Sequence, residues 1–434
     1  MNDYDCAFLV YDPMRAKRKD MSFDGNDNIG ARVIADTLTR AGLRVGYVTP
    51  GSASTVPIVL ISMTSTHDIY AILKAVSLRS DWQRDKRTFK VIAGGFGMQN
   101  PTGLRKYVDY AAFGRSHEWI ERVVRDVLAG REPKHGSLMD VPVYSPATIY
   151  QGGLYPHEID GYKEEFTGCP QKCKFCHFSH AREYATIDGQ KRDIYSQGLL
   201  TKGASKELMF KSLMKLTGKV GRVRVAIDGL SQRLRFLYGK AITNQDIIDG
   251  INHVGSFGPN ASTMLVYNIG NFPTETDADY AEFVGTISQA DPKYRVIFVL
   301  HTTPFRPSLY TPMQWEGVNI YPDWSKRRAS VILDRPNFRA VHSFTLETPW
   351  SHLRSLVSER ATDADMDALH AITHAPRLNN ENHDTALKIF TANFGDKWTQ
   401  QMDIDDDPPF PFVESYIATD QLRAKARKLR LGQW

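Results

Sequence analysis

The chain carries, at residues 166–176, the stretch Phe166-Thr-Gly-Cys-Pro-Gln-Lys-Cys-Lys-Phe-Cys176, in which the cysteines follow a C-x3-C-x2-C spacing. These cysteines are Cys169, Cys173 and Cys176, three of the four in a chain of 434 residues. Four cysteines are too few to cross-link a chain of this length, and three thiols on one short loop are typical of metal ligands rather than of disulfides. The stretch therefore predicts a metal centre.

Three thiolates on one loop can hold three irons of a 4Fe–4S cluster and leave the fourth iron open to another ligand. Two other interpretations compete with the cluster. Residues 173–177 also match the C-x-x-C-H motif that attaches haem, and His177 or His180 could complete a Cys3His zinc site. Haem of this kind is attached outside the cytoplasm, and structural zinc loops usually pair two separated C-x2-C knuckles, so the cluster is favoured. Cys6, in an apolar stretch, is expected to be a core thiol.

The residues that follow the cysteines alternate between strand and helix patterns, which predicts a β/α domain. Residues 160–330 lack a nucleotide-binding glycine signature, and the alternation favours a partial (β/α)6 barrel. The expected strands are residues 162–166, 223–227, 264–269 and 295–300, and the expected helices are residues 206–216, 244–254 and 277–290.

The residues before the cysteines show the same alternation, with a helix pattern at residues 29–41 between the first two strand patterns. We therefore expect residues 1–130 to form an α/β domain with a doubly wound, Rossmann-like parallel sheet. Residues 131–159, rich in Pro, Gly and His, are expected to be a linker. Residues 331–434 lose the alternation and are expected to form a helical C-terminal region.

The composition is that of an ordinary globular protein, with 42% hydrophobic and 24% charged residues. The net charge of +5 does not by itself require a polyanionic partner. The longest charge-free stretch, residues 255–274, is interrupted by Gly, Pro, Asn and Ser, so it is excluded as a membrane span. The acidic start Met1-Asn-Asp-Tyr-Asp is unlike a signal peptide, and we expect a cytoplasmic protein without a membrane partner.

At the cysteine loop the chain resembles the radical SAM superfamily, whose hallmark is C-x3-C-x-aromatic-C, with Phe175 in the aromatic position. Residues 228–235, 268–276 and 303–315 resemble further segments of these enzymes, and the second of them contains one additional residue, Asn271. The resemblance implies an enzyme that cleaves S-adenosylmethionine (SAM) reductively at a 4Fe–4S cluster and uses the 5′-deoxyadenosyl radical for hydrogen abstraction. It also implies that SAM contacts Phe175, Asp228, Ser231, Arg233, Arg235, Asn268, Gly270 and Glu275.

The N-terminal residues resemble the cobalamin-binding domain that precedes the barrel in one large radical SAM class. Residues 60–65, 91–95 and 107–114 carry this resemblance, and it implies that Ser62, Thr64, Gly94 and Gly95 contact the cofactor. Residues 115–118 replace acidic positions of the family, and no Asp-x-His-x-x-Gly motif is present. Members of this class bind cobalamin or keep the fold without it, so both states stay open, as do methylation and radical rearrangement of the substrate.

Basic residues are concentrated in residues 202–240, which hold ten Lys or Arg against two acidic residues, a net charge of +8. Residues 423–430 add five more basic residues. Such stretches are either solvated surfaces or sites for the phosphates of a nucleotide or nucleic acid substrate. The enzyme interpretation implies an electron donor such as flavodoxin or ferredoxin. The alternative is a zinc-stabilised, non-catalytic nucleic-acid-binding protein.

Overall fold

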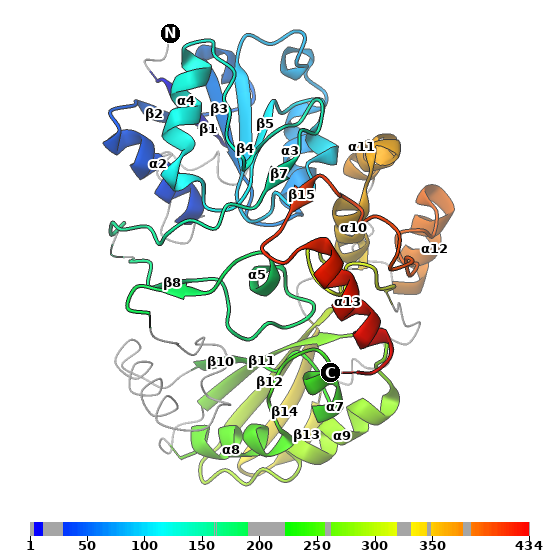
Figure 1. The fold of residues 1–434 in the computed structure, drawn as a ribbon. Helices are drawn as coiled ribbons and strands as arrows, with labels where there is room; N and C mark the ends of the chain where they lie inside the picture. The colour runs from blue at the N-terminus through cyan, green and yellow to red at the C-terminus, as the bar shows by residue number, and fades with distance from the viewer. Residues whose placement is uncertain are drawn as a thin grey trace.

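The computed structural model describes residues 4–11, 29–159, 161, 163–189, 222–256, 262–318, 331–344, 349–375 and 383–433. In these residues the chain forms two main sheets, one near each end of the molecule, joined by the segment that carries the cysteines (Figure 1). The expected helix at residues 206–216 lies outside the described residues. So do residues 202–221 of the basic stretch that spans residues 202–240.

The first sheet has six strands in the order β2-β1-β3-β4-β5-β6. Its first five strands are parallel, which confirms the mixed α/β fold with parallel strands expected for this part of the chain. Helices α2 and α4 pack on one face and α3 on the other, so both faces are buried. The elements are β1 (Cys6–Leu9), α2 (Ile29–Arg40), β2 (Val45–Val48), β3 (Ile58–Ser62), α3 (Asp68–Val76), β4 (Lys90–Gly94), β5 (Tyr110–Ala112), α4 (Ile120–Leu128) and β6 (Leu138–Asp140).

The stretch expected to be a linker, residues 131–159, contributes structure of its own. Strand β6 lies within it and pairs antiparallel with β5, so it closes one edge of the first sheet. Strand β7 (Ala147–Thr148) pairs with β15 (Val413–Glu414), which ties the stretch to the C-terminal part of the chain. Its Pro and Gly content indicated a connection, but short strands at a sheet edge leave little periodicity in the sequence.

The second sheet has five strands in the order β10-β11-β12-β14-β13, and β10, β11, β12 and β14 are parallel. Helices α8 and α9 pack on one face through a common apolar core. In the part of the chain that the structure describes, this sheet is open, and the expected (β/α)6 barrel stays a prediction. The elements are β10 (Arg222–Ala226), α7 (Gln232–Leu237), α8 (Asn244–Val254), β11 (Ser262–Gly270), α9 (Asp277–Ile287), β12 (Val296–Pro304), β13 (Val331–Arg335) and β14 (Phe338–Phe344).

The expectation of a helical region from residue 331 is wrong for its first residues. Strands β13 and β14 form an antiparallel hairpin, and β14 joins the second sheet beside β12. The helices that follow are α10 (Pro349–Arg360), α11 (Met366–His374), α12 (His383–Phe394) and α13 (Thr419–Arg430). Helices α10 and α11 share the apolar core on the α3 face of the first sheet, whereas α13 packs beside the cysteine segment (Figure 1). Among the described residues, every helix is too short or too polar to cross a membrane.

Candidate functional site

The three cysteines lie on a loop between the short strand β8 (Phe166–Thr167) and the single-turn helix α5 (His177–His180). A close backbone approach shapes the start of this loop. Gly168 has φ +69°, and a Cβ on it would lie 2.3 Å from the carbonyl oxygen of Glu183. Ser179 closes the other end, because its hydroxyl donates to the carbonyl oxygens of Cys173 at 3.1 Å and Cys176 at 2.9 Å. The loop is therefore a defined turn rather than an open coil.

The loop packs against the turn that follows α7, at the carboxyl edge of the second sheet. The backbone N–H of Lys174 donates to the carbonyl oxygen of Tyr238 at 2.9 Å. A Cβ on Gly239, which has φ +85°, would lie 3.4 Å from the Cα of Cys173. Ligands of parallel α/β sheets bind outside the carboxyl ends of the strands. The cysteines thus occupy the edge of the sheet where a bound group is expected.

All three cysteines are free thiols; Cys169 and Cys173 are buried, exposing 7% and 5% of their surface, and Cys176 is half-buried. Burial raises the pKa of each thiol, and the neighbouring cysteines add to the rise at Cys169 and Cys173. A bound metal reverses this, because a coordinating thiol loses its proton. Without a bound metal, burial therefore favours the neutral thiol at all three positions.

Three thiols on one loop are donors that an iron–sulfur cluster or a zinc ion could use. Among the described residues, no group of three or more His, Cys, Asp or Glu side chains is placed to hold one metal ion. A tetrahedral zinc, with Zn–S bonds of about 2.3 Å, requires its sulfur ligands within roughly 4 Å of one another. A cluster binds each cysteine at a different iron, so its ligands stand farther apart. Neither His177 nor His180 completes a zinc tetrahedron with the cysteines here.

A buried ion pair lies directly beneath the cysteine loop. The Lys240 ammonium, of which only 3% is exposed, pairs with the Asp228 carboxylate and donates to the carbonyl oxygen of Ala226 at 3.0 Å. The positive charge of Lys240 opposes the rise in the pKa of Cys173 that burial causes. Asp228 has φ +44°, an unusual backbone conformation for this residue at the end of β10. The pair fixes a positive charge beside the thiols.

The SAM-contacting residues expected from the resemblance divide into two groups in the structure. Arg235 is fully buried, and its guanidinium donates to the carbonyl oxygens of Ile242, Gly229 and Leu230 at 2.8, 3.1 and 2.7 Å. With these donors, and with Nη2 donating to Oδ1 of Asn244, Arg235 braces the α7 turn. Its expected contact with SAM stays a prediction.

Ser231 and Arg233 also have structural partners. Ser231 is the N-cap of α7 and its hydroxyl donates to Asp279 at 2.5 Å, while Arg233 forms an ion pair with the same carboxylate at 2.6 Å. Asn268 accepts a hydrogen bond from the backbone N–H of Gly229 at 2.8 Å and so joins the ends of β10 and β11. These contacts shape the strand ends of the second sheet.

The remaining expected residues lie near the loop or at the same sheet edge. The ring of Phe175 packs on Phe272 with centroids 5.7 Å apart, in a cluster that includes Leu429 of α13. Glu275 is buried, with 3% of its surface exposed, and follows the turn after β11 that begins at Gly270. Asp228, Phe175, Gly270 and Glu275 thus remain proposals for the SAM site.

A cavity of about 490 Å³ opens at the carboxyl ends of the first sheet. Its floor is apolar and lies between the sheet and α2, with Val33 among its lining residues. All four residues expected to contact cobalamin line it: Ser62, Thr64, Gly94 and Gly95. A Cβ on Gly95, which has φ +102°, would lie 2.4 Å from the carbonyl oxygen of Met63, so only glycine fits there.

The cavity also contains residues that sequence reasoning missed. Phe178 and Arg182, which follow the cysteines, line it together with Arg115 and His117 from the end of the first sheet. The Arg182 guanidinium lies 5.7 Å from the ring centroids of both Phe96 and Phe178, and burial lowers its pKa to about 10. Arg115 and His117 occupy positions where the cobalamin-binding domain that the sequence resembles has acidic residues. This replacement was the only feature of the sequence that could have drawn attention to them.

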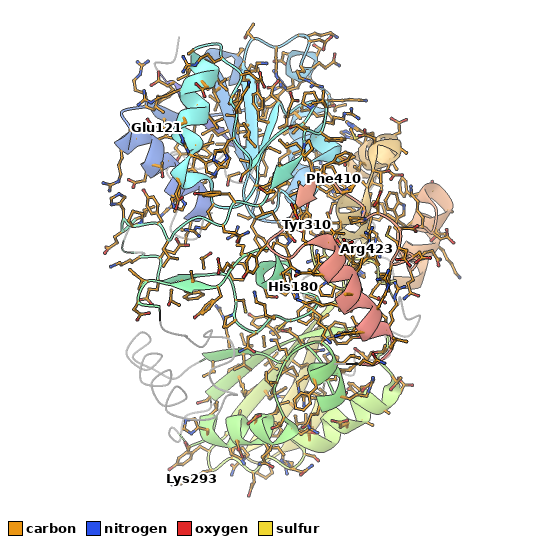
Figure 2. All side chains as sticks on the ribbon, viewed as in Figure 1. Glu121, His180, Lys293, Tyr310, Phe410 and Arg423 are labelled. Atoms are coloured by element: carbon orange, nitrogen blue, oxygen red, sulfur yellow. The ribbon has the colours of Figure 1, made fainter. Side chains whose placement is uncertain are left out.

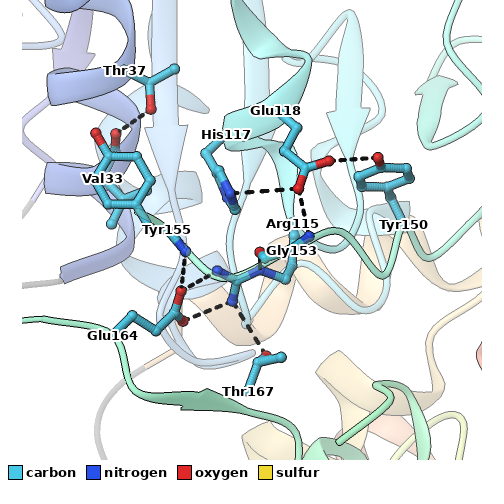
Figure 3. Close-up of polar contacts among 10 residues, drawn as sticks. All are labelled: Val33, Thr37, Arg115, His117, Glu118, Tyr150, Gly153, Tyr155, Glu164 and Thr167. Carbon is cyan, nitrogen blue, oxygen red and sulfur yellow. Dashed lines mark hydrogen bonds and ion pairs between the residues drawn. The ribbon is translucent and has the colours of Figure 1, made fainter. Parts of the chain in front are cut away.

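A polar network joins the end of the first sheet to the cysteine segment (Figure 3). The Arg115 guanidinium forms a two-pronged ion pair with Glu164 and also donates to Thr167 of β8 at 3.3 Å. Glu164 in turn accepts from the backbone N–H of Tyr155 at 2.7 Å, and Gly153 accepts from Arg115 at 2.7 Å. The network fixes β8, and with it the start of the cysteine loop, against the first sheet.

The two histidines after the cysteines do not line the cavity. His177 is bonded through Nδ1 to the carbonyl oxygen of Leu309 at 3.1 Å, and burial lowers its pKa to about 4. His180 lies 3.2 Å from the carbonyl oxygen of Cys176, and burial likewise lowers its pKa to about 4. Both are therefore structural side chains that bond to backbone carbonyl groups and favour the neutral form.

No protein family model matches the chain, and no curated protein sequence does. One solved structure similar to it is that of the apo, selenomethionine-labelled, cobalamin-dependent S-adenosylmethionine radical enzyme OxsB. The TM-score is 0.31 at 10% sequence identity, over 98% of this chain. The chain spans 60% of the length of that protein. A likeness this low carries no argument about the present chain, so the proposals below stand on its own residues.

Proposed function

We propose that the chain is a radical SAM enzyme whose 4Fe–4S cluster is held by Cys169, Cys173 and Cys176. The carrying observation is that these three thiols, of which Cys169 and Cys173 are buried and Cys176 is half-buried, lie on one loop at the carboxyl edge of a parallel sheet. When bound, a cluster with one open iron supplies, together with SAM, a one-electron cleavage that yields the 5′-deoxyadenosyl radical. The residues around it would orient an unidentified substrate so that it loses a hydrogen atom to that radical and 5′-deoxyadenosine is formed.

Within this proposal, the chain's own residues bind, orient and exclude water. The cysteine loop would hold three irons, and the fixed charge of Lys240 would offset the negative charge of the thiolates. Phe175, in the apolar cluster with Phe272 and Leu429, would provide a flat apolar surface for the adenine of SAM. Asp228 and Glu275 would provide acceptors for its polar groups.

We further propose that the cavity of the first sheet binds cobalamin. Its floor is apolar, Gly94 and Gly95 line it, and its volume falls in the range of small-molecule sites. Arg182 would place a partly buried positive charge beside the cobalamin. Cobalamin binding would favour methyl transfer as the outcome of the radical step, whereas an empty cavity would favour rearrangement.

The test is anaerobic reconstitution with iron and sulfide, followed by addition of SAM and dithionite. We expect about four irons for each chain and formation of 5′-deoxyadenosine, both lost in Cys173→Ala. Cys6→Ala is the matched control, because Cys6 is a buried core thiol of β1 and should leave both unchanged. Stoichiometric zinc without iron or sulfide would instead support the zinc-stabilised nucleic-acid-binding protein. Equal 5′-deoxyadenosine formation by Cys173→Ala would overturn the proposal.

A further inference from the structure

We propose that the second sheet binds the substrate through a planar aromatic ring stacked on Tyr267 and an anionic group paired with Arg224. The inference rests on the proposed function and adds the chemical class of the substrate. The neighbours of these two residues, Val225 and Val266, belong to the apolar core under α8 and α9. Because side chains alternate between the two faces of a strand, Arg224 and Tyr267 lie on the opposite face. This face, here called the substrate face, carries Arg224, Ala226, Tyr267 and His301.

Tyr267 and His301 form a pair of stacked rings on the substrate face. They stand opposite each other where β11 pairs with β12, and their ring centroids are 5.7 Å apart with an angle of 26° between the ring planes. Tyr267 still exposes 40% of its surface. His301 lies on one side of the Tyr267 ring, and since β11 runs between β12 and β10, the other side of the ring is turned toward β10. An aromatic ring held in this way can stack on a further ring.

The residue beside Tyr267 on β10 is Ala226, whose small side chain leaves room for such a ring. Ala226 and Tyr267 are partners in the pairing of β10 with β11, so their side chains point to the same face. Neighbouring strands lie about 4.8 Å apart. This spacing falls within the range of about 4.5–7 Å that separates the centroids of interacting aromatic rings. A planar ring that stands over the methyl group of Ala226 would therefore stack on Tyr267.

Arg224 supplies a positive charge next to this position. It precedes Ala226 by two residues on β10, so the two Cα atoms lie about 6.6 Å apart along the strand and both side chains are on the substrate face. The Arg224 side chain is exposed. Within the part of the chain that the structure describes, no carboxylate forms an ion pair with it. A phosphate or carboxylate group on the substrate would provide that partner, because the guanidinium binds both through paired hydrogen bonds.

The other end of the substrate face lies at the cysteine loop. The carbonyl oxygen of Ala226 accepts a hydrogen bond from Lys240, which lies beneath that loop, at 3.0 Å. Ile269, farther along the same face of β11, packs on the same apolar cluster as Phe175. The ring of the substrate would therefore lie between Arg224 and the proposed iron–sulfur cluster. The hydrogen atom would leave from the ring end of the substrate, and the anionic group would be turned away from the reaction.

A nucleoside monophosphate and an aromatic carboxylic acid both have this chemistry, and binding experiments separate them. The probes are adenosine 5′-monophosphate and indole-3-acetate, titrated calorimetrically into the full chain after reconstitution with iron and sulfide and with SAM present, and into the chain without iron and sulfide. Adenosine supplies the ring without the anion. The variants are Tyr267→Ala, Tyr267→Phe and Arg224→Gln. The controls are Tyr4→Ala, which removes a tyrosine of similar exposure, and Lys293→Gln, which removes an exposed charge at the far end of the second sheet (Figure 2).

We expect the dissociation constant of the tighter-binding probe to rise about tenfold in Tyr267→Ala and less than about twofold in Tyr267→Phe, which keeps the ring. Arg224→Gln should raise it about fivefold at low salt and less at high salt, because salt screens an exposed charge. Adenosine should lose affinity in Tyr267→Ala and keep it in Arg224→Gln. Tighter binding of adenosine 5′-monophosphate would identify the substrate as a nucleotide, and tighter binding of indole-3-acetate would identify it as an aromatic acid.

Two results would overturn the inference. One is that neither probe binds the reconstituted chain with a dissociation constant below about 1 mM. The other is that Tyr267→Ala and Arg224→Gln bind the probes as tightly as the two controls do. In both cases a chain that still forms 5′-deoxyadenosine leaves the proposed function standing. A chain that binds a probe through Tyr267 and Arg224 but takes up no iron and sulfide would overturn the proposed function and leave the ligand site in place.

Discussion

The ring of Phe96, in the loop after β4, packs edge to face on His177 with ring centroids 5.2 Å apart. His177 directly follows Cys176, and Phe96 lines the cavity of the first sheet. One pair of rings therefore links the two sites to which we assign cofactors. The segment from His177 to Arg182 extends this link, because its last residue also lines the cavity.

The ion pair between Arg115 and Glu164 is expected to hold the cysteine segment in place. We predict that Glu164→Gln lowers the free energy of unfolding by about 2–3 kcal/mol, because it leaves the guanidinium of Arg115, of which 8% is exposed, without its countercharge. Urea denaturation measures the loss. Asp81→Asn is the control, since the exposed pair of Asp81 with Arg79 should contribute no more than about 1 kcal/mol. Equal losses in the two variants would contradict the prediction.

Filling the cavity of the first sheet should prevent cofactor binding. Val33 of α2 lines its floor, and Val33→Phe adds a ring that occupies part of the 490 Å³. We predict at least a tenfold weaker retention of hydroxocobalamin, measured by absorbance after gel filtration, because tenfold corresponds to only about 1.4 kcal/mol. The partner variant Val33→Ala widens the same site and should retain the cofactor. If both variants behave like the unaltered chain, cobalamin does not bind at this cavity.

Removing the charge of Lys240 is expected to leave Asp228 unpaired under the cysteine loop. We predict that Lys240→Met lowers the free energy of unfolding by about 3 kcal/mol and shifts the reduction potential of the reconstituted cluster to a more negative value. Adding Asp228→Asn should recover most of the stability, because no unpaired charge then remains. Chemical denaturation and a redox titration followed by electron paramagnetic resonance measure the two effects. If the double variant is no more stable than Lys240→Met, the loss of stability in Lys240→Met does not come from the unpaired charge of Asp228.

Glu359 gives the chain a dependence of stability on pH. Burial raises the pKa of this carboxyl above its ordinary value, and Arg306 opposes the rise. The folded state then binds the Glu359 proton more tightly than the unfolded state does. The protonated carboxyl therefore adds to the free energy of unfolding at low pH, and this contribution is lost as the pH rises through the raised pKa. We predict that Glu359→Gln is more stable than the unaltered chain by about 1 kcal/mol at pH 8, whereas the two are equal at pH 4.

Urea denaturation at both pH values tests this, with the exposed residue Glu414 as the control in Glu414→Gln. The free energy of unfolding of Glu414→Gln should change between the two pH values by as much as that of the unaltered chain. If Glu359→Gln were less stable than the unaltered chain, and more so at pH 8 than at pH 4, the fold would require the carboxylate rather than the carboxylic acid.

The cysteine loop was predicted from the spacing of its thiols, whereas the glycines of the cavity were expected from a resemblance, and the structure supplies a local reason for one of them. Thiol spacing identifies a donor set, and Gly95 is required by its own backbone conformation. Phe178 and Arg182 could not be placed in this way. They lie more than eighty residues from Gly95 in the chain, and only the packing of α5 on the first sheet brings them to its edge.

Arg235 shows a different limit of the sequence. A basic residue near an expected SAM site is compatible with binding a carboxylate and with bracing a turn, and only the contacts distinguish the two roles. Strands β13 and β14 were missed for a third reason. They are joined by a tight turn of two residues and followed by helix patterns, so their alternation was hidden within a region that otherwise looks helical.

The sharing of the segment from His177 to Arg182 by the two sites has a thermodynamic consequence. If a cluster on the loop tightens binding in the cavity by some factor, a filled cavity must tighten retention of the cluster by the same factor, since linkage between binding sites is reciprocal. Each cofactor would then act as a stabiliser of the other. Loading the chain with both should therefore follow a cooperative assembly in which the second group binds to a segment that the first has already ordered.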